Sequence, residues 1–332
     1  MLNSTSNNPA TNKLTVGVSQ EQIREAVSKS GYPLQTIVAA NLRKEFQVQE
    51  EWSYIDPDSQ SSRTIDILAS KYLYDLSKDN PRIRPVLNLL VECKQSELPY
   101  VFFLSGGRFI TREFPVIAGL FKDEIVLKTD DSKSSWVFPI LFVLDLKKHP
   151  FISEGPECCA TFSKCVRKGN ELELSGSDPF NSLVLPILKA IQHFKKAQSP
   201  PSTALYFDCH TVFGLAVLDA PMVGIRITEK GEEMLFTPWV RVLRHESYES
   251  QDWLKRSTLY GIDILHRDFF PGLLKEASVP IRRRFFIACV KTPRGNCVGK
   301  GLCVWFGEKQ LARNRKAPAT QEVGGIGCSV TA

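Results

Sequence analysis

The sequence predicts an α/β fold in which helices flank a central mixed β-sheet. Short segments rich in β-branched and aromatic residues recur along the chain, bounded by the turn-forming residues that separate strands. One of them, VLNLLVECK at 86–94, is almost continuously apolar, which is typical of a central strand buried on both faces. Apolar residues at helical spacing occur in fewer segments, mainly within 19–46 and 181–197. Strands interspersed with helices favour a layered α/β architecture.

The first helical segment begins at Ser19, which forms a capping-box pattern with Gln22. Gly31 and Pro33 interrupt this segment, so we expect two helices, the second with Pro33 in its first turn. The second helix has a face for packing against a sheet, formed by Leu34, Ile37, Val38, Asn41 and Leu42.

A series of strands is expected next. Residues 46–54 are rich in β-forming residues, and IDPDSQSS at 55–62 has the composition of a turn. A second strand is expected within 64–74, the apolar segment 86–94 is the third, and YVFFL at 100–104 is a fourth. These strands are sufficient to form the centre of a sheet.

The second half of the chain is expected to add strands that pack on this sheet or extend it. Strands are predicted at 136–146, 205–209, 213–220, 222–228, 235–245, 259–265, 284–291 and 301–306, with helices at 181–197 and 269–277. Residues 1–14 are predicted to be a disordered lead-in and residues 310–332 a flexible tail. We expect residues 15–309 to form one domain with elaborations, because no linker is long enough to force a division.

The composition is that of an ordinary globular protein, with 43% hydrophobic and 23% charged residues. No apolar run of about 18 residues and no secretory signal is present, so we expect a cytoplasmic protein without a membrane partner. The nine cysteines include no CxxC pair, which favours reduced thiols over disulfides or structural zinc. Ten of the 42 basic residues but one of the 36 acidic residues lie in 280–316, an excess that suits a phosphate backbone or a solvated surface.

Two charged residues end the most apolar predicted strand. Glu92 and Lys94 are two residues apart and therefore project from the same face of the strand. Charge in such surroundings is costly unless it is paired or binds a cation. On the preceding strand, Asp66 stands between Ile65 and Ile67. If the two strands are neighbours, the carboxylates of Asp66 and Glu92 can converge on one hard cation, with Lys94 beside it.

This arrangement fits the hydrolysis of phosphodiester bonds. Mg²⁺ prefers oxygen ligands and is usually held by one or two carboxylates together with water and substrate phosphate. The bound cation polarises the phosphoryl oxygen and supplies a hydroxide-like nucleophile. An adjacent ammonium such as that of Lys94 can orient the water and stabilise charge in the transition state. We expect Mn²⁺ to substitute for Mg²⁺.

The segment from GYPLQTIVAANL through RTIDILA to LLVECK resembles the core of the PD-(D/E)XK nucleases, the restriction-endonuclease-like superfamily. Asp66, Glu92 and Lys94 match the family motif with the spacing D-x25-E-x-K, and the resemblance covers about residues 19–105. It implies that Asp66, Glu92 and the backbone carbonyl of Cys93 bind Mg²⁺, while Lys94 acts on the attacking water. It also implies a nucleic-acid substrate, with DNA favoured because most of the resembled families act on DNA.

The sequence departs from the family pattern at two places. Asp66 is preceded by Ile65 instead of proline. Many relatives carry a glutamate on the first helix near the metal, where this sequence offers Gln35. A neutral amide is a poorer metal ligand, so Gln35 is predicted to contact substrate, and Glu25 is an alternative source of the carboxylate.

Three arginines are predicted to contact substrate. Arg63 lies three residues before Asp66, where it can reach a phosphate or form a surface ion pair. Arg282 and Arg284 precede two phenylalanines, a combination that can follow a phosphate backbone and stack on bases. A basic sheet edge that resists aggregation explains the same pair equally well.

Other functions stay open on the sequence alone. A non-catalytic nucleic-acid-binding or scaffold protein on the same fold is the main alternative, and Gln35 is its best support. A hydrolase that uses Cys209 and His210 is a third, although adjacent strand residues point to opposite faces. Assembly into a homodimer is also open.

Overall fold

The structure, a computed structural model, describes residues 3–75, 83–105, 114–120, 124–128, 135–139, 141, 146, 150–201, 203–247 and 257–275. For residues 124–128, 135–139, 150, 153 and 257 it describes the backbone alone. Several predictions from the sequence therefore lie outside the described residues: Arg282, Arg284, the strands at 284–291 and 301–306, and the tail 310–332.

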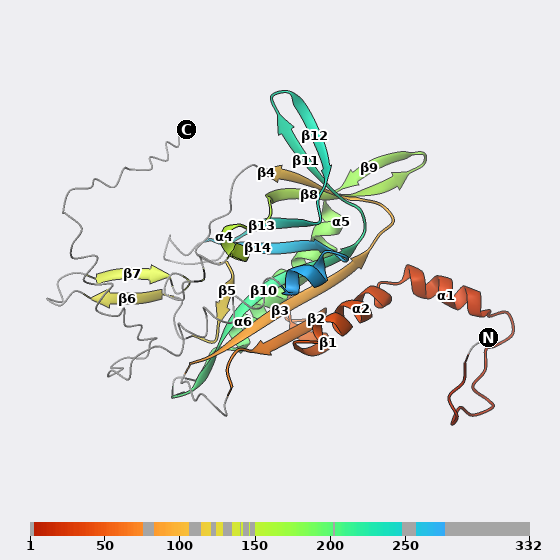
Figure 1. The fold of residues 1–332 in the computed structure, drawn as a ribbon, viewed down its shortest axis with the longest axis horizontal. Coiled ribbons are helices and arrows are strands. Elements are labelled where there is room, and N and C mark those ends of the chain that lie inside the picture. The colour runs from red at the N-terminus through yellow and green to blue at the C-terminus, as the bar shows by residue number, and fades with distance from the viewer. Residues whose placement is uncertain are drawn as a thin grey trace.

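A large mixed β-sheet forms the centre of the molecule, which confirms the predicted α/β class (Figure 1). In sheet order its main path runs β1 (Gln47–Ile55), β2 (Ser62–Tyr72), β3 (Ile83–Gln95), β10 (Phe207–Asp219), β14 (Ser257–His266), β13 (Trp239–Ser247), β8 (Cys158–Lys168), β4 (Tyr100–Ser105), β11 (Met222–Thr228) and β12 (Gly231–Phe236). Two further strands, β5 (Val116–Ala118) and β9 (Glu171–Ser175), pair with β10 and β8 and bring the sheet to 12 strands. A separate two-stranded sheet consists of β6 (Glu124–Lys128) and β7 (Ser135–Pro139).

The first three strands form an antiparallel meander, and β10 and β14 then continue the sheet parallel to β3. The central strand β3 is buried over most of its length, as its apolar sequence predicts. Parallel pairing of β3 with β10 extends over 13 residue pairs as far as Gln95, so the carboxyl end of β3 is fixed on its β10 side, beyond the last β2 pair at Val91.

The N-terminal helices are α1 (Gln20–Lys29) and α2 (Tyr32–Leu42), separated as predicted. Both hydrogen bonds of the capping box are present: the Gln22 N–H donates to Ser19 Oγ at 3.1 Å, and the Ser19 N–H donates to Gln22 Oε1 at 2.8 Å. Pro33 occupies the first turn of α2. No residue of α1 is buried, whereas α2 packs on the sheet.

Two hydrophobic cores cover the two faces of the sheet around β3. On one face, here called the α2-side core, helix α2 packs against alternate residues of β3; its members include Leu34, Val38, Leu42, Leu87, Leu89 and Val91. On the other face, the α6-side core, helix α6 (Leu185–Ala197) packs against the remaining residues; its members include Ile187, Ile191, Leu90, Ala216 and Ile262. The alternation along β3 and β10 follows from strand geometry.

The structure differs from the predicted elements in several details. Ile37 is 56% exposed and does not belong to the packing face of α2, because the row Leu34, Val38 and Leu42 fixes which side of the helix meets the sheet. The segments 205–209 and 213–220 contribute to one long strand, β10, because the intervening His210, Thr211 and Val212 also pair with β3. The segment 235–245 is divided between β12 and β13, with Pro238 between them.

The remaining helical segments are short, except for α6, which has 13 residues. The predicted helix at 181–197 begins as α5 (Ser177–Pro179) and a π-helical turn, η2 (Phe180–Val184), and becomes α6 at Leu185, with Pro186 in its first turn. A helix α4 (Pro150–Ser153) and a helical stretch at 270–275 complete the described helices. Not one of them has the length and apolar character that crossing a bilayer requires.

Candidate active site

Asp66 and Glu92 lie next to each other on neighbouring strands, as the sequence predicts. The ladder between β2 and β3 includes the pair Ile67 and Val91, and the two carboxylates follow directly beyond it. Asp66 Oδ2 accepts a hydrogen bond of 2.7 Å from the backbone N–H of Cys93. The side chain of Asp66 thus reaches across to β3 at the level of Glu92.

The hairpin formed by β1 and β2 twists sharply at the level of Asp66. Ile65 and its partner Trp52 pack in the α6-side core, whereas Ile67, two residues further, packs in the α2-side core. Residues two apart on a regular strand share a face, so the strand turns over between these positions. Asp66 lies at the turnover, and its carboxylate therefore points towards the adjacent strand instead of into either core.

Glu92 is a buried carboxylate with incomplete hydrogen bonding. It is 5% exposed, and burial together with the nearby Asp66 raises its pKa to about 7. Its Oε1 accepts from Lys94 Nζ at 2.6 Å, whereas its buried Oε2 accepts no hydrogen bond of normal geometry, although the backbone N–H of Asp66 lies near enough to the carboxyl group to lower its pKa slightly. A buried carboxylate oxygen without a partner is costly and marks a position where a cation or a donor would be stabilising.

Lys94 completes the predicted trio. Burial opposes its charge, but the carboxylate of Glu92 raises the pKa of Lys94 above its usual value. Lys94 is therefore a permanent cation at neutral pH, with a third of its side chain exposed. The side chain of Cys93 packs in the α2-side core, where burial raises the pKa of its thiol, so its backbone carbonyl is the atom that can face a cation held by Asp66 and Glu92.

The structure brings Gln35 and one unpredicted residue, Glu51, to this site. Gln35 is 7% exposed and lies on α2. Its Nε2 donates to Glu51 Oε1 at 2.8 Å and to the backbone carbonyl of Asp66 at 3.2 Å. Glu51 is an exposed residue of β1, and its charge contributes to the raised pKa of Asp66, for which burial is the larger cause.

Glu51 was detectable in principle from the hairpin register. A turn centred between Asp58 and Ser59 pairs Glu50 with Ile67 and Trp52 with Ile65, which leaves Glu51 opposite Asp66. The alternative carboxylate, Glu25, lies on α1 and pairs with Lys29 at 2.5 Å, outside the contacts of Asp66 and Glu92.

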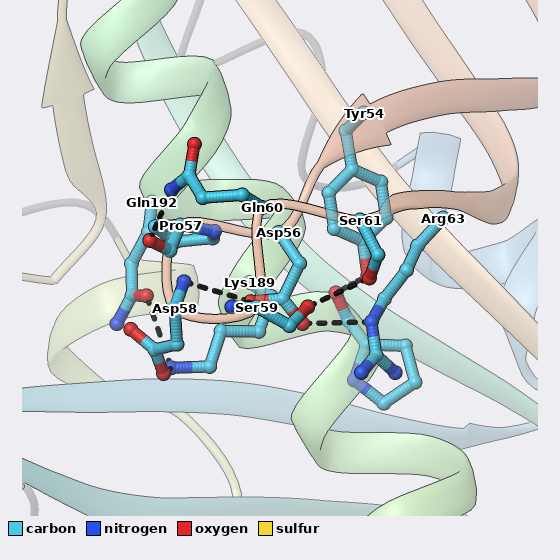
Figure 2. Close-up of polar contacts among 11 residues, drawn as sticks. Tyr54, Asp56, Pro57, Asp58, Ser59, Gln60, Ser61, Arg63, Lys189 and Gln192 are labelled. Carbon is cyan, nitrogen blue, oxygen red and sulfur yellow. Dashed lines mark hydrogen bonds and ion pairs between the residues drawn. The ribbon is translucent and has the colours of Figure 1, made fainter.

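Arg63 is engaged in the polar network of the β1–β2 turn (Figure 2). Its Nε lies 2.7 Å from Asp56 Oδ2. Burial would raise the pKa of Asp56, but the N–H groups of Asp58 and Ser59 and the charge of Arg63 hold it below the usual value. Asp58 in turn pairs at 2.6 Å with Lys189, a residue of α6 that is 8% exposed. This network ties the turn to α6 and holds Arg63 through its Nε, while 47% of the Arg63 side chain stays exposed.

Cys209 and His210 do not face each other. Cys209 belongs to the α2-side core. His210 lies on the other face, where its ring contacts Phe194 of α6 and its Nδ1 lies 2.9 Å from Asn88 Nδ2. Burial lowers the pKa of His210 to about 4, so it is neutral at physiological pH. This placement argues against a thiolate–imidazole pair.

The residues fit a hard divalent cation of the Mg²⁺ type. Within the described ranges no three His, Cys, Asp or Glu side chains are grouped closely enough to hold a metal ion by themselves. Mg²⁺ seldom needs such a group, because one or two carboxylates with water and phosphate suffice. Asp66 and the unsatisfied oxygen of Glu92 offer these two carboxylates.

Comparisons of the chain with protein-family models, with curated proteins and with solved structures found no match. A function for this chain must therefore be inferred from its own residues and their geometry.

Proposed function

We propose that this protein is a Mg²⁺-dependent nuclease that hydrolyses phosphodiester bonds of nucleic acid, with DNA the favoured substrate. The observation that carries the proposal is the buried, unpartnered Oε2 of Glu92 beside Asp66 and Lys94. Two carboxylates and an ammonium in one partly buried site suit the binding of a divalent cation and a phosphate. The resemblance of this region to PD-(D/E)XK nucleases supports the same assignment.

In this proposal Asp66, Glu92 and the backbone carbonyl of Cys93 hold the cation. The cation, when bound, activates water and polarises the phosphoryl oxygen. In the metal-free protein the carboxylate of Glu92 raises the pKa of Lys94, which is then a cation at neutral pH. As a cation it orients the attacking water as a hydrogen-bond donor and stabilises negative charge in the transition state. Twisting of β2 at Asp66 brings the carboxylate to the carboxyl end of β3.

A cleavage assay tests this function. Purified protein is incubated with single- and double-stranded DNA and RNA in Mg²⁺, in Mn²⁺ or in EDTA. We expect cleavage with either metal, none in EDTA, and a loss of at least about a hundredfold in Lys94→Ala and Asp66→Ala. Lys71→Ala is a matched control, because Lys71 is a lysine of β2 that also pairs with a carboxylate, that of Glu45, at 2.5 Å. Cleavage that persists in both site variants would refute the assignment.

A second function is favoured by one observation. Lys94 already pairs with Glu92 at 2.6 Å, so part of the buried charge is compensated without a cation. A non-catalytic nucleic-acid-binding or scaffold protein on the same fold would retain such a pair. It predicts binding that weakens steeply with salt, and no turnover of any of the four substrates with either metal.

A further inference from the structure

Glu51 has an unusual backbone conformation for its place in a strand. Its φ is 51°, in the left-handed region, although it lies in the middle of β1. A residue with a Cβ seldom adopts this conformation, and a glutamate within a strand has no turn to explain it. Glu51 lies opposite Asp66, at the position where the side chains of β1 and β2 switch from one face of the sheet to the other. Strain of this kind is retained where the surrounding structure requires it.

The side chain of Glu51 is held in place by a buried donor. Gln35 Nε2 bridges Glu51 Oε1 and the backbone carbonyl of Asp66, at 2.8 and 3.2 Å. Gln35 is buried on α2, a helix that is anchored in the α2-side core. One oxygen of the Glu51 carboxylate is thus fixed near Asp66, while the residue itself stays exposed to solvent.

We propose that Glu51 is a positioning residue of the cation site, which accepts a hydrogen bond from water carried by the cation that Asp66 and Glu92 bind. This inference rests on the proposed function. Gln35 then serves to orient the Glu51 carboxylate from α2.

The lack of a group of three metal-ligating side chains among the described residues favours action through water over direct coordination. Glu51 lies close enough to Asp66 to contribute to its raised pKa, yet the two are not grouped with Glu92 as ligands of one ion. Mg²⁺ keeps several of its waters in protein sites, and these waters need acceptors. Groups that hold the ligands of a metal typically change its affinity by roughly 10- to 100-fold when removed.

Binding of Mn²⁺, measured by electron paramagnetic resonance without nucleic acid, tests this role. Glu51→Gln keeps the side-chain shape and the acceptor for Gln35, but removes the charge. We expect it to weaken Mn²⁺ binding roughly tenfold. Glu50→Gln is the matched control, because Glu50 is the preceding residue of β1 and its carboxylate pairs with Arg43, away from the site. It should bind Mn²⁺ like the wild type.

A second variant separates positioning from structure. Glu51→Gly removes the cost of the left-handed backbone, so it should raise the melting temperature in EDTA while it weakens Mn²⁺ binding. Wild-type affinity in Glu51→Gln or Glu51→Gly, or equal weakening in Glu50→Gln, would overturn the inference while Asp66→Ala still abolished binding. Absence of Mn²⁺ binding by the wild type, or binding that Asp66→Ala leaves unchanged, would instead overturn the proposed cation site itself.

Discussion

Substitution of Glu92 by glutamine should make the metal-free protein more stable at neutral and alkaline pH. The pKa of Glu92 is about 7 in the folded protein, against 4.5 for the free side chain. Since the folded state binds the proton more tightly, the stability contributed by protonated Glu92 is fully present below the unfolded-state pKa and is lost as the pH rises through 7. A shift of one unit corresponds to about 1.4 kcal/mol, so this single group costs about 3 kcal/mol by pH 8.

The assay is chemical denaturation of wild type and Glu92→Gln in EDTA, from pH 4 to pH 8. Subtraction of the two free energies of unfolding at each pH cancels the groups that both proteins share. We expect the difference to grow by about 3 kcal/mol in favour of the variant across this range. Glu171→Gln, which neutralises an exposed glutamate of β9, should show no such trend. A difference that is flat with pH would refute the conclusion that Glu92 is a strained, unsatisfied carboxylate.

Three further substitutions test the packing of the central sheet and its cores. Because the pKa of His210 is lowered to about 4, the free energy of unfolding of the wild type should fall by about 3 kcal/mol as the pH falls from 6.5 to 4. His210→Gln should abolish this loss, and chemical denaturation at both pH values measures it. Arg241→Leu should lower the free energy of unfolding by about 3–5 kcal/mol, since it leaves the buried carboxylate of Asp263, 2.9 Å away, unpaired; replacement of both residues by leucine should recover much of the loss. Gly214→Ala should cost about 1–3 kcal/mol, because its Cβ would lie 2.5 Å from Ile187 Cγ2; an unchanged melting temperature would contradict that packing.

The central part of the fold follows from local sequence, and the rest depends on distant contacts. The meander of β1, β2 and β3 was predictable because an apolar strand, a turn of Asp, Pro and Ser residues and a capped helix each leave a local signal. The insertion of β10 between β3 and β14 leaves none, because its partner in β3 lies more than a hundred residues away and is selected by packing.

The residues of the candidate site divide in the same way, into those with a local sequence signal and those placed by distant contacts. Asp66, Glu92 and Lys94 were found because charge in apolar strands is conspicuous. Glu51 was missed because QEEW looks like an ordinary exposed strand, and only the hairpin register places it opposite Asp66. The exposure of Ile37 was missed for a similar reason, since helical spacing does not reveal which edge of an apolar face meets the sheet.

Anomalous diffraction from crystals that contain Mn²⁺ would test the central claim most directly. We predict a peak within bonding distance of both Asp66 and Glu92, with Lys94 Nζ released from Glu92 or shared with a bound phosphate. Absence of a peak there at saturating Mn²⁺, with the Lys94–Glu92 pair intact, would contradict a metal-dependent nuclease and favour the binding-only alternative.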